Sequence, residues 1–243
     1  MSEEYKSRAI ILHTIKHGDN GHIVYMYSQH YARISCYVNS SRSGRPLIGK
    51  SKIALQPLTM IDYVGSKSMR GEFHRLSQVK RAYVPDSMVF DINKSTVALF
   101  MGEVIYKIVR DVEPDPLLFD FLYSSIVSLD KLHGGEASYH LYFMTKLLPF
   151  LGYCPQNTYM ENSFFDMKRS LFVVIRPSHP NYFEVSESRL FSRFISADLT
   201  ILPEIKCGRA LRVSLLNNII SYISLHHETN YNIVSLKILS EIF

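Results

Sequence analysis

The residues best suited to chemistry lie in a polar stretch at positions 39–52. It holds Arg42, Arg45, Lys50 and Lys52 among serines and glycines, and it contains no acidic residue. Cationic side chains on such a loop can bind a phosphodiester backbone, because contact with phosphates releases condensed counterions. The stretch therefore predicts contact with a polyanion.

Residues 44–51 of the same stretch also match the phosphate-binding pattern G-x-x-x-x-G-K-[ST]. That pattern holds a nucleotide when a strand enters the loop and a helix begins at its Lys-Ser. A strand before the loop is expected. Pro57 and the β-prone residues 58–64 follow too closely for the helix of a βαβ unit. A protein that binds ATP or GTP through Gly44 to Ser51 stays as the alternative.

Two strands must hold this loop. The side chains of residues 33–38 alternate between apolar and polar, as a half-buried strand requires, and residues 58–64 are again β-prone. Five short strands are expected in the first third of the chain, at residues 8–15, 22–27, 33–38, 58–64 and 73–81. Five strands in about 80 residues correspond to a small closed barrel of the OB type.

Such barrels bind single strands with stacked aromatic rings and with cations that follow the backbone. Tyr37 adjoins the basic loop and is the best stacking candidate. For the other barrel aromatics, which are Tyr25, Tyr27, Tyr31, Tyr63 and Phe73, a place in the core is the simpler expectation. The predicted DNA-binding residues are Arg33, Tyr37, Arg42, Arg45, Lys50, Lys52, Lys67 and Arg70. An RNA-binding regulator built on the same barrel is a second alternative.

The charge of the chain is unevenly distributed. Residues 1–82 carry six lysines and seven arginines against five acidic residues, whereas residues 83–243 have a small negative balance within a total of +5. This asymmetry favours one domain that meets a polyanion and one that does not. The three cysteines are widely spaced and form no disulfide framework. With no secretory signal and no apolar stretch of membrane-spanning length, a cytoplasmic protein with no membrane partner is expected.

Beyond residue 82 the pattern becomes helical. Helices are expected at residues 96–109, 117–132, 137–151, 186–195, 207–226 and 234–242, with Ser186 as an N-cap, and a hairpin is expected at 164–175. The predicted class is α+β. An OB-fold nucleic-acid-binding domain at 1–82 precedes an α-helical domain at 83–243, which carries a small β insertion at about 153–185.

Other candidate sites are few. Arg189 and Arg193 are four residues apart on a short helix and could hold an acidic peptide tail. No Ser, His and Asp occur in a recognisable nucleophile context, so no catalytic residue is predicted and the protein is expected not to be an enzyme. No cofactor is expected.

Seven segments together resemble the RecO family of bacterial recombination mediators. They are residues 8–14, Gly18-Asp19, Ala32-Arg33-Ile34-Ser35, residues 55–59 (Leu-Gln-Pro-Leu-Thr), residues 113–119, residues 148–153 (Leu-Pro-Phe-Leu-Gly-Tyr) and residues 235–239. The resemblance spans nearly the whole chain. It implies an OB fold followed by a helical domain, binding to single- and double-stranded DNA, and annealing of complementary strands. Implied partners are RecR, the acidic tail of the single-stranded-DNA-binding protein and, indirectly, RecA, in a bacterial cytoplasm at the nucleoid.

The chain departs from this family at one place. Many members follow the Leu-Gly-Tyr landmark with two cysteine pairs that hold zinc. Here only Cys154 follows it, next to Pro155, and no Cys-x-x-Cys occurs in the chain. A closed zinc site needs four thiolate or imidazole ligands, which Cys154 and His179 cannot supply. No metal is therefore predicted, and the hairpin's apolar residues Phe164, Phe165, Leu171 and Phe172 are expected to stabilise the insertion.

Overall fold

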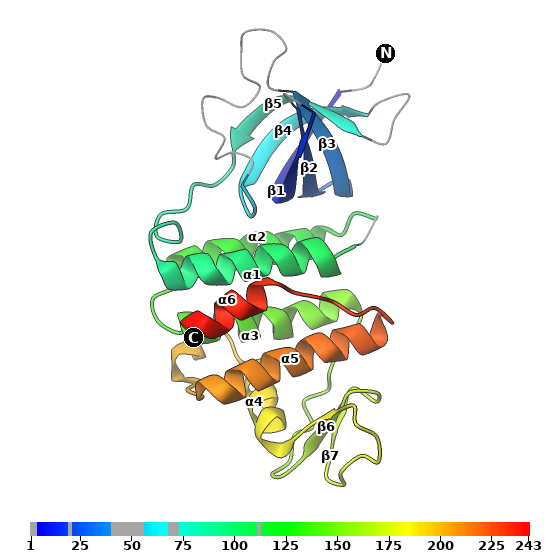
Figure 1. Cartoon of the computed structure of the whole chain (residues 1–243), viewed down its shortest axis with the longest axis vertical. Helices are drawn as coiled ribbons and strands as arrows, with labels where there is room; N and C mark the ends of the chain where they lie inside the picture. Colours follow the sequence, from blue (N-terminus) through cyan, green and yellow to red (C-terminus); the bar gives the residue numbers. More distant parts are fainter. Residues whose placement is uncertain (1–3, 19–20, 40–55, 68–72, 111–112) are drawn as a thin grey trace. The chain divides into compact units, whose positions relative to one another are not determined.

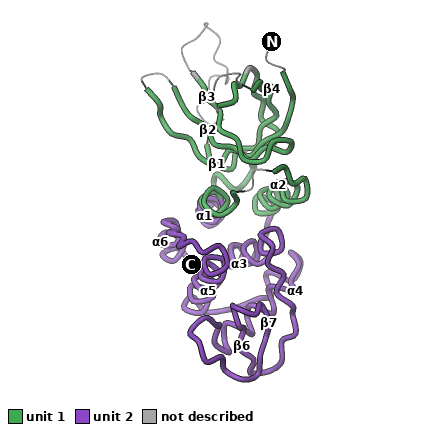
Figure 2. Tube along the Cα trace, turned by 90° about the vertical axis from the view of Figure 1, so that its right-hand side faces the viewer, with its two compact units in different colours: residues 1–90, 102–131 green, residues 91–101, 132–243 purple. Residues whose placement is uncertain are grey.

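The computed structural model describes residues 4–18, 21–39, 56–67, 73–110 and 113–243. Packing divides the chain into two compact units, shown in two colours in Figure 2. The first unit contains Met1–Phe90 and Gly102–Lys131, and the second contains Asp91–Met101 and Leu132–Phe243. Each unit has its own core and is described separately.

A closed five-stranded barrel forms the centre of the first unit (Figure 1). Its strands are β1 (Glu4–His17), β2 (Gly21–Ser28), β3 (Ala32–Asn39), β4 (Met60–Lys67) and β5 (His74–Arg81). They follow each other around the barrel in the order β1-β2-β3-β5-β4, with a parallel pairing only between β3 and β5. All five strands were predicted, and the closed barrel is confirmed.

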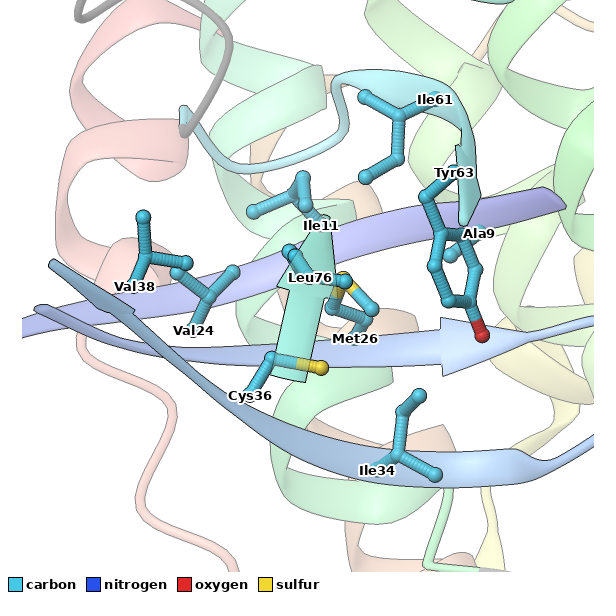
Figure 3. Close-up of a cluster of buried hydrophobic side chains, with 10 residues drawn as sticks. All are labelled: Ala9, Ile11, Val24, Met26, Ile34, Cys36, Val38, Ile61, Tyr63 and Leu76. Carbon is cyan, nitrogen blue, oxygen red and sulfur yellow. The ribbon is translucent and has the colours of Figure 1, made fainter. Parts of the chain in front are cut away.

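The side chains of each strand point alternately into and out of the barrel, and the inward ones fill its interior. Ile34, Cys36 and Val38 of β3 point inward and are buried, while the residues between them point outward. Figure 3 shows how side chains from all five strands meet in this interior. Strand β1 pairs with both β2 and β4, and its register shifts between Ile11 and His13. Such an irregularity bends a long strand, which lets β1 close the barrel.

Helix α2 (Pro116–Lys131) begins at a well-defined cap within the first unit. The carboxylate of Asp115 accepts hydrogen bonds from the N–H groups of Leu117 at 2.9 Å and Leu118 at 3.1 Å. Pro116 occupies the first helical position, where its missing N–H costs nothing. The sequence predicts this helix to within one residue.

The other end of α2 holds the segment that leaves the barrel. The buried Asp130 carboxylate accepts the backbone N–H groups of Asp86 at 2.8 Å, Ser87 at 2.9 Å and Met88 at 2.6 Å, and the Tyr83 hydroxyl at 2.5 Å. Burial alone would raise the pKa of Asp130, but these hydrogen bonds outweigh it and lower the pKa to about 2. We call this arrangement the Asp130 clamp.

The second unit is helical, with a small sheet. Its elements are the first part of α1 (Ile92–Ile108), α3 (Glu136–Leu147), the 3-10 turn η2 (Leu148–Leu151), α4 (Val185–Ser196), the 3-10 turn η3 (Leu202–Glu204), α5 (Arg209–His226), α6 (Ser235–Ile242), and strands β6 (Phe164–Asp166), β7 (Leu171–Val173) and β8 (Tyr182–Phe183). The predicted hairpin is β6 and β7, and β8 adds a third strand in the order β7-β6-β8.

The N-cap of α4 differs from the prediction. Ser186 is not the N-cap of α4: Glu184 occupies that position, and the Ser186 hydroxyl donates to Glu187 at 2.8 Å. The division at residue 82 agrees with the end of the strands at Arg81, yet the packing units group Gly102–Lys131 with the barrel. The predicted domain boundary therefore stays a prediction.

Among the described helices, none is long and apolar enough to cross a bilayer.

Candidate nucleic-acid interface

The outer face of β2 and β3 is partly covered by the C-terminal half of α1. The Tyr106 ring lies 4.8 Å from the His13 ring, 5.6 Å from the Tyr25 ring and 4.7 Å from the Arg33 guanidinium. Arg33 Nη1 donates to the Tyr106 carbonyl at 2.7 Å, and burial lowers the Arg33 pKa. Arg33 thus interacts with carbonyls at the end of a helix, where a cation is favourable. Arg33 is therefore not a residue of the candidate interface.

Tyr37 lies on the same outer face as Arg33, four residues further along β3. Its side chain is 38% exposed, and its ring meets the His17 ring edge-on at 6.0 Å. The ring passes so close to Gly21 that a Cβ there would be 2.6 Å from the Tyr37 hydroxyl. Only glycine leaves room for the ring at this place. In the strand register Tyr37 stands beside Arg75 of β5, which is exposed.

Two further aromatic side chains are exposed near the start of β5. Phe73 is 40% exposed and directly precedes His74, and Tyr31, which is 37% exposed, has its ring 5.9 Å from the His74 ring. Lys67 is exposed at the end of β4 and pairs in register with His74. We call Tyr31, Tyr37, Lys67, Phe73 and Arg75 the aromatic–basic surface. Tyr27 and Tyr63, by contrast, are buried as expected.

Burial disfavours the charged forms of the polar groups inside this part of the barrel. Burial raises the pKa of Tyr63 to about 12, and its hydroxyl is 2.8 Å from Ser28 Oγ. Burial, together with the charge of Lys67, lowers the pKa of His74, whose Nδ1 pairs with the Tyr5 hydroxyl. Burial also raises the pKa of Cys36 to about 12, so its thiol is a poor nucleophile. These groups stabilise the barrel and are poorly suited to acid–base chemistry.

Five of the predicted DNA-binding residues, Arg42, Arg45, Lys50, Lys52 and Arg70, lie outside the described residues. The phosphate-loop match at residues 44–51 does as well. The first described element after that match is β4, a strand. Of the predicted residues that the structure describes, Tyr37 and Lys67 lie at the same end of the barrel, where they pair in register with the neighbouring β5 residues Arg75 and His74, and Arg33 is held by Tyr106.

Two family models match the chain. The model for the Recombination protein O N terminal matches residues 1–83, and the model for the Recombination protein O C terminal matches residues 89–232. The chain belongs to the RecO family. Proteins described as DNA repair protein RecO are 28% identical in Azobacteroides pseudotrichonymphae and 29% identical in Bacteroides fragilis. The alignments cover 98% of this chain in both cases, and 99% and 98% of those relatives.

The residues present do not fit the zinc site that many RecO-family members hold. Across the described ranges, no group of three or more His, Cys, Asp or Glu side chains could hold a metal ion. Cys154 is exposed, and His179 instead lies with its Nε2 3.4 Å from the Asp166 carboxylate. We derive no function from a metal in this chain.

Aromatic packing stabilises the insertion of this RecO-family chain. Phe165 of β6 is fully buried, and its ring lies 5.2 Å from Phe172, 5.0 Å from Phe183, 4.9 Å from Phe191 and 5.4 Å from Tyr222. These rings come from β7, β8, α4 and α5. Tilted and edge-on pairs of this kind add to the area that each ring buries. They attach the small sheet to the helices of the second unit.

Arg189 and Arg193, the predicted residues for an acidic tail, are both exposed on α4. Arg189 lines a cavity of about 650 Å³ that is also lined by Glu161 and Glu184. Arg193 Nη2 donates to the Glu204 carbonyl at 3.3 Å. The two carboxylates beside Arg189 disfavour an acidic ligand at this place.

A smaller cavity of about 140 Å³ lies among α3, α5 and α6. Arg212 and the exposed Lys237 line it together with apolar side chains, which include Leu216 and Leu239. His140 is buried at its wall, and burial and the charge of Arg212 lower the His140 pKa to about 3. The buried His140 Nδ1 and Arg212 Nε have no hydrogen-bond partner in the part of the chain that the structure describes. Arg212 donates to the Cys207 carbonyl at 2.9 Å and to the Phe243 carbonyl at 2.6 Å, so Lys237 is the exposed cation of this cavity.

Proposed function

We propose that this RecO-family DNA-repair protein is a mediator without catalytic activity. It binds single- and double-stranded DNA, anneals complementary strands coated by single-stranded-DNA-binding protein, and helps RecR to load RecA. The observation that carries the proposal is the aromatic–basic surface of the barrel. There, exposed rings for bases and cations for phosphates adjoin each other.

Annealing by this mechanism needs no bond chemistry. Two complementary strands repel each other through their phosphates, and bound lysine and arginine side chains neutralise that charge. While the cations neutralise the phosphates, Tyr37 and Phe73 can stack on the bases. Such stacking accepts any base sequence. The proposal also assigns phosphate contacts to the cations Arg42, Arg45, Lys50 and Lys52 of the sequence. RecR, RecA and a nucleoid location in the bacterial cytoplasm belong to this proposal through the family.

Strand annealing tests the proposal directly. Two complementary oligonucleotides carrying a FRET pair are coated with single-stranded-DNA-binding protein, and annealing is followed with and without ATP and magnesium. We expect fast annealing that does not depend on ATP. Replacing Arg42, Arg45 and Lys50 by alanine should slow annealing and reduce the salt slope of single-strand binding by about 2, which is about 0.7 per phosphate contact. The matched control replaces Lys168, Arg169 and Lys206, which are exposed in the second unit.

Other outcomes of this experiment favour the alternatives. If annealing is absent and ATP is hydrolysed in a way that Lys50→Ala abolishes, the protein is a nucleotide-binding protein that uses Gly44 to Ser51. Tighter binding to RNA than to DNA of the same sequence would favour the RNA-binding regulator, since the 2′-hydroxyl distinguishes the two backbones. An unchanged salt slope in the triple variant excludes the loop as the binding site.

We also propose that the acidic tail of the single-stranded-DNA-binding protein binds the helical part of the chain. The small cavity supports this better than the Arg189–Arg193 pair, because no Asp or Glu side chain lines it, whereas Glu161 and Glu184 line the cavity beside Arg189. Its volume, about 140 Å³, suits one apolar side chain, since a cavity of about 150 Å³ takes up benzene.

Peptide binding distinguishes the two locations. Lys237→Glu should weaken binding of a fluorescent acidic peptide with an apolar C-terminal residue by about tenfold, which corresponds to about 1.4 kcal/mol. The Arg189→Ala, Arg193→Ala variant should bind it almost as well as the original chain, as measured by fluorescence anisotropy. The opposite pattern would assign the tail to α4.

A further inference from the structure

The outer face of β1, β4 and β5 carries a polar groove of about 600 Å³. None of its charged residues was in the predicted DNA-binding set. The groove residues that matter here are Lys6, Arg8, Asp62, Val64, Gln78 and Lys80. All six point outward, because the alternate residues Ser7 and Tyr63 point into the barrel and are buried there.

The strand register arranges these side chains in two rows across the sheet. In the first row Lys6 stands beside Val64, and Val64 beside Gln78. The second row has the order Arg8, Asp62 and Lys80. Cations of the two outer strands thus flank the middle strand.

The single carboxylate of the groove is neutralised within it. Arg8 Nε donates to Asp62 Oδ1 at 2.9 Å, which pairs these two charges. Lys6 and Lys80 are exposed, and the described residues supply no ion pair to either of them. The groove therefore carries a net positive charge from two accessible lysines. Gln78 adds a neutral amide, which can donate to an oxygen of any backbone.

The groove continues into the aromatic–basic surface along β4 and β5. Arg75 stands beside Ser66 in the register, and Ser66 and Asp62 are four residues apart on β4, about 14 Å at the strand rise of about 3.4 Å per residue. This even separation keeps both residues on the outer face, whereas Lys67 has the parity of Tyr63, which points into the barrel. Exposed cations of the outer face thus lie near both ends of β5, Arg75 at one end and Lys80 at the other.

The opposite side of the barrel is less accessible. OB barrels often bind nucleic acid on the face of strands 2 and 3. Here Tyr106 covers part of that face by contacting Tyr25 and Arg33. A nucleic-acid strand that continues along the barrel surface beyond Tyr37 would meet the exposed cations of β4 and β5.

We infer that a single nucleic-acid strand runs from the aromatic–basic surface along β4 and β5 into the groove, where Lys6 and Lys80 contact its phosphates. This inference rests on the proposed function, because it assumes that the barrel binds nucleic acid. It adds binding residues and a direction for the strand. Contacts by lysine carry no sequence information, so the groove would bind any single strand equally well.

Salt-dependent binding of a 16-nucleotide single strand tests the inference. A Lys6→Gln, Lys80→Gln variant should show a salt slope that is smaller by about 1.4, and about tenfold weaker binding at 0.1 M salt. Lys6→Arg with Lys80→Arg keeps both charges and should restore the original slope. The matched control, Lys168→Gln with Arg169→Gln, removes two exposed cations of the second unit and should change neither quantity.

The outcomes separate this inference from the proposed function. If the original chain binds and the Gln variant keeps its slope, the strand does not enter the groove, while the proposed function stands. If the original chain does not bind a single strand at all, both are wrong. If the salt slope of single-strand binding is also smaller in the Lys6→Arg, Lys80→Arg variant, the positive charge of the lysines does not explain the slope. That result would also overturn the inference.

Discussion

Replacing Asp130 by alanine should lower the free energy of unfolding of the first unit by about 3 kcal/mol, since hydrogen bonds to a charged group each contribute about 1.5–3 kcal/mol. The change removes the acceptor of three backbone N–H groups at once. The segment from Tyr83 to Met88 then loses its attachment to α2. Hydrogen exchange should report this as faster exchange of the amides of Asp86, Ser87 and Met88.

The effect of Asp130 should depend on pH in a defined direction. Its folded-state pKa of about 2 lies below the ordinary value of about 3.9 for an unfolded aspartate. The ionised carboxylate therefore stabilises the folded state above about pH 4, by about 2.6 kcal/mol, and this contribution is lost as the pH falls toward 2. Asp130→Asn cannot titrate, so the stability difference between it and the original chain should shrink over that range.

Asp198 provides a matched control. Its carboxylate accepts the Thr200 hydroxyl at 2.6 Å and the backbone N–H groups of Thr200 at 2.8 Å and Ile201 at 3.2 Å, and these hydrogen bonds also lower its pKa. Asp198 is exposed, however, so water can replace the lost acceptor. Asp198→Ala should have a much smaller effect. Equal effects of the two substitutions would contradict the importance of the Asp130 clamp.

Phe165→Ala should destabilise the second unit by about 3–5 kcal/mol, the usual cost of removing a buried phenylalanine ring. Phe165 contacts four other rings, so its loss leaves a cavity at the junction of the small sheet with α4 and α5. Denaturant unfolding followed by tyrosine fluorescence measures the change. The chain contains no tryptophan to mask that signal.

The neighbouring residue gives the control for this prediction. Phe164→Ala removes an equally large ring from the same strand, but Phe164 is only half-buried and contacts Tyr182 at 5.7 Å. Its effect should be clearly smaller. A metal chelator should leave the unfolding midpoint of the original chain unchanged, because aromatic packing stabilises the insertion. A midpoint lowered by chelation would indicate a metal and overturn this explanation.

Periodicity predicts the elements of this protein well for a simple reason. The alternating burial of β3 and the helical spacing of apolar residues in α2 are consequences of local geometry, which the order of side chains records. Strand β8 is two residues long, which is too short to show a periodic pattern in the sequence. It forms because it pairs with the edge of β6 that β7 leaves open. The N-cap of α4, Glu184, likewise lies two residues before the predicted cap Ser186, because capping depends on backbone angles that the sequence does not display.

The pattern of the sequence likewise does not show which single residues of the candidate site are accessible. Arg33 and Tyr37 share one face of β3, and periodicity cannot distinguish them. Tyr106, more than 60 positions later in the chain, covers Arg33, whereas Gly21 leaves room for the Tyr37 ring. Lys6 and Lys80 are likewise unremarkable in the sequence. They flank one groove only because β1 and β5 both pair with β4.

The sequence by itself therefore determined the class of fold, the order of the elements, the basic character of the first third and the family, because each depends on local pattern or on ordered motifs. Only the tertiary structure decided which cations remain accessible, that Asp130 holds the segment leaving the barrel, and which rings of α4 and α5 pack against the small sheet. These features depend on contacts between residues far apart in the chain, which burial and strand pairing create.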